Sequence, residues 1–327
     1  MTRQGVPIAH LWLRPIRLRI PGLLDLVVIS DPDQIHWLNQ HEHVVREIDP
    51  AASWLHRVID QRLRIDLGFD GGMLPVFRPR ADAGRASAQQ ALTERLETLR
   101  GNLGRESEEI ADYVSGEKDV DEIGVTVQHW CGRLFLPHYR AAQETYAAAR
   151  LLAGWPSAPP WRTWKQRTDG RLADAKQRVS EEAGGDLHCI HGTTIGMENV
   201  ARSVRKQRVA AQDAHRQRLS PDDILRECLV APPVVLRRCT QDVEAPFLGR
   251  PLTRTTVILF LVARAFAASG DLDVAFLADG WSACPAQRVI PEMLRAVWHA
   301  AHHDEAEQEP LLAKINTWSR IWQRAVS

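Results

Sequence analysis

The stretch "ADGWSACPAQRVIPEMLRAV" (residues 278–297) places a cysteine between a Gly-Trp-Ser turn and a proline that an amphipathic run follows. Proline favours the first position of a helix, so we expect a helix to begin at Pro285. The sulfur of Cys284 would then lie near the helix N-terminus, where the dipole and the unpaired amides favour a thiolate. Such a thiolate serves as a nucleophile, a redox sensor or a metal ligand. The alternative, which the cysteine taken alone favours, is that Cys284 is only a small buried hydrophobe.

The composition of the 327-residue chain is that of a globular protein, with 44% hydrophobic and 25% charged residues. Lys and Arg together number 41, as do Asp and Glu, so the charge balance does not indicate a nucleic-acid partner. The five cysteines show no paired framework, which favours a reducing, cytoplasmic compartment. Arginines interrupt the apolar part of residues 1–22, and the longest apolar run, Val257–Ala263, has only the length of a strand. We therefore expect no signal peptide and no membrane span.

Apolar periodicity and helix-terminal residues predict a mainly helical chain with a small β portion. A strand is expected at residues 23–31, with a helix after it that opens at an Asp-Pro pair. The other predicted helices lie at residues 81–103, 125–136, 139–154, 170–185, 191–218 and 220–230, with more from Pro285 onward. Pro and Trp make residues 155–164 a predicted loop, and residues 234–267 are expected to form short strands with turns. No linker interrupts the pattern, so we expect one α+β domain over residues 1–327.

Residues 231–297 resemble the C-terminal third of the cytochrome P-450 family. The segment "APPVVLRRCTQDVE" looks like the one after that family's ExxR helix, where an arginine precedes a Thr-x-Asp by three residues, and Arg237 takes this place. "LGRPLTRTTVILFLVARA" looks like the family's next hairpin and apolar strand. "FLADGWSACPAQ" looks like the cysteine loop F-G-x-G-x-H/R-x-C-x-G, which puts Cys284 on the haem-ligand cysteine and Gly280 on the second glycine.

Weaker similarity covers most of the remaining chain. "LPVFRPRADAGRASAQQAL" is similar to the segment whose His and Arg hold the haem propionates, which puts Arg85 on that arginine and Ala81 on the missing histidine. The stretch between Ala149 and His188, where the family's substrate-covering helices lie, is short here. The resemblance then implies a distal pocket that is open or is closed by a partner subunit. Three tryptophans should cover its entrance: Trp155, Trp161 and Trp164.

The cysteine loop and the ExxR helix also depart from the family pattern. Four positions of the loop differ: Leu277 replaces Phe, Ala278 replaces the first Gly, Ser282 replaces His or Arg, and Ala286 replaces the last Gly. In the helix, the Glu and Arg positions fall on Arg226 and Leu229, so the family's ion pair is missing there. The chain resembles a trimmed and diverged relative.

The long helix carries the family's distal motif in altered form. A-G-x-[DE]-T would fall on "CIHGTT", which puts Gly192 in place of the acid, Thr193 on the alcohol of the distal side and Thr194 beside it. Threonine also often bonds within its own helix, and this alternative stays open. An acid introduced at Gly192 should be tolerated unless the backbone φ is positive there. The overlapping "HCIH" has no second Cys/His pair at ligand spacing, which argues against zinc.

The resemblance implies haem b with Cys284 as thiolate ligand and Arg237 on a propionate. It implies oxygen insertion into a small apolar molecule, or a related oxidation, with electrons from a separate ferredoxin-type partner. A haem enzyme that uses peroxide or performs non-oxygenating chemistry stays open, because Gly192 removes the acid. The rival hypothesis is a degenerate relative without productive haem that acts as a binding or recruitment module. The missing ExxR pair favours the rival, and the retained Cys284 and Arg237 favour the enzyme.

Overall fold

The computed structural model describes residues 14–70, 72–74, 89–90, 92–94, 96–97, 104–117, 123–154, 160–213, 215–278 and 280–302. The chain divides into two compact units. The first takes in residues 1–86, 154–172 and 231–284, and the second takes in residues 87–153, 173–230 and 285–327. The five-stranded sheet belongs to the first unit, and helices make up most of the described structure. This is the mainly α fold with a small β portion that the sequence predicts.

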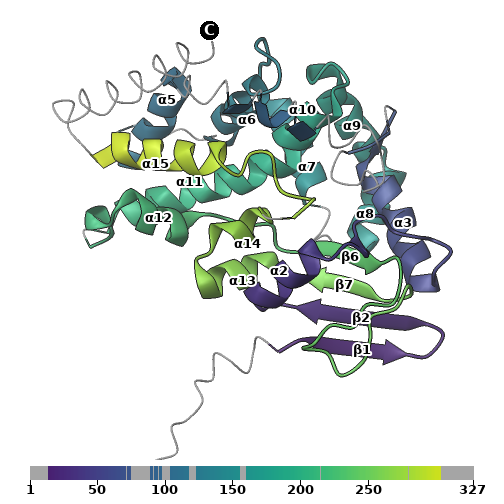
Figure 1. The fold of residues 1–327 in the computed structure, drawn as a ribbon. Helices are drawn as coiled ribbons and strands as arrows, with labels where there is room; N and C mark the ends of the chain where they lie inside the picture. The colour runs from purple at the N-terminus through teal and green to yellow at the C-terminus, as the bar shows by residue number, and fades with distance from the viewer. Residues whose placement is uncertain are drawn as a thin grey trace, which may run out of the picture. The chain divides into compact units, whose positions relative to one another are not determined.

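The sheet of the first unit has five strands in the order β1-β2-β7-β6-β3 (Figure 1). They are Ile16–Ile20 (β1), Leu24–Ile29 (β2), Val44–Val45 (β3), Val235–Cys239 (β6) and Val257–Phe260 (β7); a separate pair consists of Gly68–Phe69 (β4) and Gly72–Met73 (β5). β2 and β7 are parallel, and the other neighbours in the sheet are antiparallel. Every second residue of β2 is buried, because successive side chains of a strand point to opposite faces.

The helices of the first unit begin at polar caps. α2 (Pro32–Gln40) starts after Asp31, whose side chain accepts a hydrogen bond from the Gln34 amide at 3.0 Å. α3 (Trp54–Leu67) starts in the same way after Ser53. The remaining helices of this unit are α8 (Pro160–Thr168), α13 (Val262–Ser269) and α14 (Leu272–Phe276). α2, α13 and α14 contact one another (Figure 1), which brings α2 beside the segment that leads to the cysteine turn.

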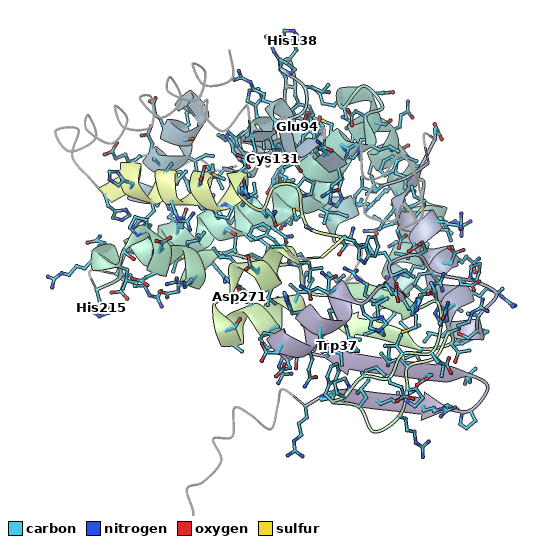
Figure 2. The ribbon with its side chains drawn as sticks, in the orientation of Figure 1. Trp37, Glu94, Cys131, His138, His215 and Asp271 are labelled. Carbon is cyan, nitrogen blue, oxygen red and sulfur yellow. The ribbon has the colours of Figure 1, made fainter. Side chains whose placement is uncertain are left out.

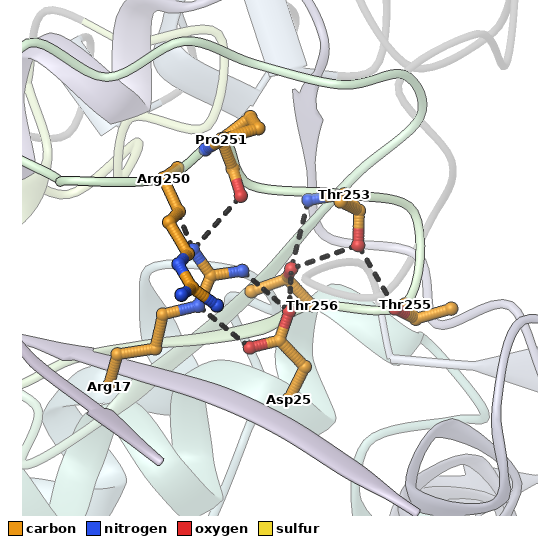
Figure 3. Close-up of polar contacts among 7 residues, drawn as sticks. All are labelled: Arg17, Asp25, Arg250, Pro251, Thr253, Thr255 and Thr256. Carbon is orange, nitrogen blue, oxygen red and sulfur yellow. Dashed lines mark hydrogen bonds and ion pairs between the residues drawn. The ribbon is translucent and has the colours of Figure 1, made fainter. Parts of the chain in front are cut away.

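A largely buried ion pair ties the edge of the sheet to the loop before β7 (Figure 3). Arg17 of β1 donates to the two carboxylate oxygens of Asp25 at 2.9 and 2.7 Å, and also to the carbonyls of Arg250 and Pro251. Asp25 accepts a further bond from the Thr256 hydroxyl at 2.7 Å. Burial raises the pKa of Asp25, but the bonds from Arg17 and Thr256 outweigh burial and hold that pKa below its ordinary value.

The described part of the second unit is helical. Its helices are α5 (Gly104–Ser115), α6 (Ile123–Arg133), α7 (Gln143–Ala153), α9 (Arg171–Glu182), α10 (Leu187–His191), α11 (Met197–Ala211), α12 (Pro221–Cys228) and α15 (Val289–His302). A π-helical turn, Gly192–Gly196 (η3), joins α10 to α11, and a 3-10 turn, Arg216–Arg218 (η4), follows α11. α11 contacts α5, α6, α12 and α15 (Figure 1). The predicted N-cap at Ser220 is confirmed, since its side chain accepts a bond from the Asp223 amide at 3.2 Å.

Several local predictions differ from the structure. The Pro-Trp stretch becomes helical at Pro160, because proline at the first position already has a helical φ. The apolar run after Thr256 is a strand only as far as Phe260, and the alanine-rich residues after it form α13. The long helix expected over residues 191–218 is helical already from Leu187, contains the π turn Gly192–Gly196 and ends at Ala211. The helix predicted over residues 81–103 lies largely outside the described residues.

The two positions expected for the ExxR pair hold no ion pair with each other. Leu229 is buried and directly follows the last residue of α12. Arg226 forms an ion pair with Asp223 at 3.4 Å. The side chains of Arg226 and Asp223 are 58% and 54% exposed, so solvent screens this pair and its contribution to stability is small. None of the described helices is long and apolar enough to cross a membrane.

Candidate functional site

The turn that carries Cys284 is closed by its own backbone. The Cys284 amide donates to the carbonyl of Phe276, the last residue of α14, at 2.9 Å, and the Ala283 amide donates to the Gly280 carbonyl at 2.9 Å. Leu277 caps α14 with a left-handed backbone (φ 51°), which is uncommon for a residue with a side chain. The result is a tight turn with the half-buried Cys284 at its end.

The expectation that Cys284 lies at a helix N-terminus is wrong. Residues 285–288 form turns, and α15 begins only at Val289. Pro285 has no amide hydrogen to offer the sulfur, and the effect of a helix dipole fades within its first turn. Pro285 lies four residues before the first residue of α15 and so does not occupy its first position. The dipole of α15 therefore does not account for a thiolate at Cys284.

Gly280 is the point at which this turn meets α2. A Cβ atom on Gly280 would lie 1.8 Å from Nδ2 and 2.7 Å from Cγ of Asn39. Since no real Cβ contact is that short, only glycine lets the turn approach the Asn39 amide so closely. Asn39 is 3% exposed and lies next to the last residue of α2.

A buried guanidinium joins the turn to the sheet. Arg237 of β6 is 0% exposed, and its Nη2 donates to Ser282 Oγ at 2.7 Å and to Asn39 Oδ1 at 3.0 Å. The Ser282 hydroxyl donates in turn to Asn39 Oδ1 at 3.0 Å, which closes a triangle of three side chains. Nη1 of Arg237 donates to the Leu236 carbonyl at 2.8 Å. We refer to Asn39, Arg237 and Ser282 as the clamp.

Two further side chains fasten the same turn. Trp281 donates its indole N–H to the Val44 carbonyl at 3.3 Å, and its ring lies 5.9 Å from the Arg237 guanidinium. Arg46 donates to the Ser282 carbonyl and lies 5.6 Å from the Trp281 ring. These separations suit cation–π contacts. Each of the three residues before Ala283 therefore has its own partner elsewhere in the first unit.

The sequence pattern pointed to Gly280 and Arg237 but missed Asn39, Arg46 and Trp281. Asn39 is 243 positions away from Ser282, and an asparagine near a helix end is ordinary, so no local pattern marks it. The one sequence signal for a partner of this turn was Ser282. A hydroxyl at a position where the family has a basic residue indicates that another residue supplies the positive charge there.

The other four cysteines are buried: Cys131, Cys189, Cys228 and Cys239. Burial raises the pKa of Cys228 to about 11 and that of Cys239 to about 12. The pKa of Cys131, which lies on α6 (Figure 2), is also raised by burial. Cys284 is thus the only one of the five thiols that is not buried.

Thr193 and Thr194 lie in the π-helical turn of the second unit and are 0% and 1% exposed. The Thr193 hydroxyl donates to the Cys189 carbonyl at 2.8 Å, and the Thr194 hydroxyl donates to the Ile190 carbonyl at 2.6 Å. Both hydroxyl protons are therefore used inside the helix, as threonine often does. π turns are frequent at functional sites, but this one directs its alcohols to its own backbone.

An aromatic ring fills the place expected for the distal acid. Gly192 has an ordinary helical backbone (φ −64°), yet a Cβ atom there would lie 2.3 Å from Cε2 of Phe135. The backbone φ therefore permits a side chain at Gly192, but an added Cβ would require the Phe135 ring to shift. The Gln128 amide donates to the Thr193 carbonyl at 3.2 Å and so satisfies part of the π turn.

The remaining candidates do not join a described site. Arg85 and Trp155 lie outside the described residues. Trp161 and Trp164 lie on α8 in the first unit and are 73% and 66% exposed. Among the residues that the structure describes, no group of three or more His, Cys, Asp or Glu side chains could hold a metal ion.

The fold matches solved cytochrome P-450 structures over most of the chain. CYP154A1 from Streptomyces coelicolor A3(2) superposes with a TM-score of 0.62 at 14% identity, over 89% of this chain and 88% of its own. CYP175A1 from Thermus thermophilus gives 0.56 at 15%, over 88% and 83%. Cytochrome P-450EX alpha (CYP152N1) with myristic acid gives 0.59 at 12%, over 89% and 84%. No protein-family model and no curated protein matches the chain.

These likenesses define the class of structure: the chain has the cytochrome P-450 fold. The resemblance seen in its C-terminal third is confirmed at the level of the fold, since the identities of 12–15% carry no further conclusion.

The residues present fit a haem ligand, whereas the expected propionate anchor already has hydrogen-bond partners. Cys284 offers an accessible thiol at the end of a short closed turn, which is the donor type that haem iron takes in this fold. Arg237 is 0% exposed, and both hydrogens of its Nη2 are directed at Asn39 and Ser282. A propionate at Nη2 of Arg237 would have to replace one of these two hydrogen bonds, and the role of Arg237 at a propionate stays a prediction.

Proposed function

We propose that this protein is a haem-thiolate protein of the cytochrome P-450 type, with Cys284 as the axial ligand of haem b. The observation that supports the proposal is the Cys284 turn. The one cysteine that is not buried ends a closed turn at the family's ligand position, in a chain with the family's fold. A bound haem with a thiolate ligand would supply electron density that favours O–O bond cleavage.

In this proposal, the protein's own residues position the ligand and leave the propionates to other groups. The bond from the Cys284 amide to Phe276 and the packing of Gly280 on Asn39 hold the turn in shape before any ligand binds. Arg237 is committed to the clamp. Arg85, outside the described residues, stays the proposed propionate partner.

The proposed reaction is an oxidation of a small apolar molecule. As a monooxygenase the protein would take electrons from a ferredoxin-type protein, whereas the versions that use peroxide or perform non-oxygenating chemistry need no such donor. The distal segment supports a version that does not rely on a carboxylate for proton delivery. Gly192 is packed against Phe135, and the hydroxyls of Thr193 and Thr194 bond within their helix. Peroxide-driven or non-oxygenating chemistry is therefore the version we favour.

The test is the reduced carbon-monoxide difference spectrum of the haem-reconstituted protein. We expect one haem per chain and the red-shifted Soret band of thiolate ligation. Cys284→Ala should abolish this band, whereas the matched variants Cys131→Ala, Cys228→Ala and Cys239→Ala should keep it. A protein that stays colourless after reconstitution would overturn the proposal.

The clamp favours a second candidate, a P-450-fold module that binds or recruits another molecule without productive haem. Arg237 and Ser282 occupy two positions that are basic in the family pattern, and here they bond to each other. A titration with haem discriminates the two candidates. The module would show no saturable binding in either the wild type or Cys284→Ala.

A further inference from the structure

We propose that Asn39 is a positioning residue for the Cys284 turn and acts through the clamp with Arg237 and Ser282. Where the turn serves as a haem ligand, the inference rests on the proposed function. Its effect on the Cys284 thiol is independent of haem, so the two ideas fail separately.

Asn39 is the acceptor that completes the clamp. Its Oδ1 accepts one bond from Arg237 at 3.0 Å and one from Ser282 at 3.0 Å, so both lone pairs are used. All three side chains are at most 3% exposed. Water cannot replace a lost bond at such a depth, which makes each acceptor costly to remove.

The buried positive charge of Arg237 determines how the clamp would respond to a substitution of Asn39. A buried charge persists only where its hydrogen-bond partners are in place. Arg237 lies on β6 and Asn39 on α2, which are regular elements, whereas Ser282 lies in a turn. If the side chain at position 39 no longer accepts these hydrogen bonds, we expect Ser282 to shift, because a turn is less constrained than a strand or a helix.

A shift at Ser282 reaches the thiol directly, because Cys284 is two residues further along the same turn. The turn bond from Ala283 to Gly280 spans Ser282, and Gly280 is packed on the Asn39 amide. Asn39 thus holds the turn twice, through polar bonds to Ser282 and through close packing on Gly280.

The clamp also accounts for serine at the position where the family has His or Arg. A second basic side chain beside the buried Arg237 would add repulsion that burial strengthens. A hydroxyl does both tasks of this position, since it accepts from Arg237 and donates to Asn39.

The experiment measures the rate at which iodoacetamide alkylates Cys284 in the folded, haem-free protein near pH 8, with peptide mapping by mass spectrometry. The other cysteines are buried, and Cys228 and Cys239 have pKa values of about 11 and about 12, so the wild type should react first at Cys284. Asn39→Leu, which keeps the size of the side chain but removes the acceptor, should raise the Cys284 rate roughly tenfold through local opening.

Three further variants separate positioning from general loosening. Asn39→Asp keeps two acceptor oxygens and should react at the wild-type rate. Ser282→Ala removes the turn's side of the clamp and should react as fast as Asn39→Leu, which keeps the test decisive if Asn39→Leu does not fold. Gln207→Leu is the matched control. It removes a buried amide bond, to the Leu294 carbonyl at 2.8 Å in the second unit, and should leave the Cys284 rate unchanged.

Folded Asn39→Leu and Ser282→Ala proteins that react at the wild-type rate would overturn the inference, as would Asn39→Asp reacting as fast as Asn39→Leu. If the protein binds haem, Asn39→Leu should also move part of the carbon-monoxide complex out of the thiolate band. A protein that binds no haem defeats the proposed function, and the alkylation rates still decide the role of Asn39.

Discussion

The Cys284 turn and the π-helical turn Gly192–Gly196 both fall where the resemblance implies haem chemistry, and each contains a glycine that a neighbouring side chain requires. At Gly280 the neighbour is the polar amide of Asn39, whereas at Gly192 it is the ring of Phe135. The first region therefore packs around a hydrogen-bonded charge, and the second packs around an apolar side chain.

The hydroxyls of the two regions differ in the same way. Ser282 bonds to side chains of two other elements, so its position depends on tertiary structure. The Thr193 hydroxyl donates to a carbonyl four residues earlier in the chain, and it also interacts with the Tyr139 hydroxyl. The comparison teaches that Ser282 in the Cys284 turn is held by side chains of two other elements, whereas Thr193 and Thr194 direct their hydroxyl protons to nearby backbone carbonyls.

The strongest test of this contrast is Gly192→Asp. The new side chain meets Phe135 and buries a carboxylate, so we expect a loss of roughly 3 kcal/mol or more in the free energy of unfolding by urea. Gly196→Ala is the matched control, because its Cβ would lie at an ordinary 3.7 Å from the His191 carbonyl. This control should be neutral or stabilised by about 0.5–1 kcal/mol. A Gly192→Asp protein as stable as the wild type would show that the Phe135 ring gives way easily.

Gly280→Ala tests the other glycine. The added methyl collides with the Asn39 amide, which the clamp prevents from moving aside, so we expect a loss of about 1–3 kcal/mol in unfolding free energy. Gly249→Ala, where a Cβ would meet nothing within 4 Å, should be nearly neutral. In the double variant with Asn39→Ala the two losses should be less than additive. Full additivity would argue against direct contact between the two positions.

Thr193→Ala should have a smaller effect than either glycine change. It removes one hydrogen bond inside a helix, which is worth about 1 kcal/mol, and leaves the Gln128 bond to the Thr193 carbonyl in place. Thr193→Ser, which keeps the hydroxyl, should recover most of the loss in thermal unfolding. With a substrate in hand, product formed per electron consumed should be the same in the wild type and Thr193→Ala. A sharp fall in that ratio would restore Thr193 to a distal role.

The smallest effect separates the β1–β2 edge of the sheet from the π turn by pH. The pKa of Asp25 is lowered in the folded state, so the stability from its ion pair with Arg17 is present above the unfolded value, about 4, and is lost as pH falls through the folded value. Wild type and Asp25→Asn should differ at pH 7 and converge near about pH 2. Hydrogen exchange should then report acid-induced opening of β1 and β2 while the π turn keeps its protection. Equal opening of both regions would show that acid acts elsewhere.

Much of the fold could be predicted from local pattern. The strand–helix pair at β2 and α2, the caps of α2 and α12, and the helices α6, α7 and α9 follow from periodicity and terminal residues. The register that places Gly280 on Asn39 could not be predicted, because the two positions are far apart in the chain and both residue types are ordinary. The sequence predicted that α15 begins at Pro285, but it begins at Val289. Proline is compatible with the first position of a helix, but it does not require a helix to start there.

The sequence by itself determined the class of fold and the identity of the candidate ligand, Cys284, because both depend on patterns that neighbouring residues carry. Only the tertiary structure decided what the flanking groups do. Arg237 looked like a free cation for a propionate, but α2 and the cysteine turn enclose it in the clamp. Gly192 looked replaceable, but Phe135 fills its space. Burial and hydrogen-bond partners are properties of the packed chain. The role of a buried charge, or of a glycine without a Cβ, can therefore be assigned only when the residues packed around it are known.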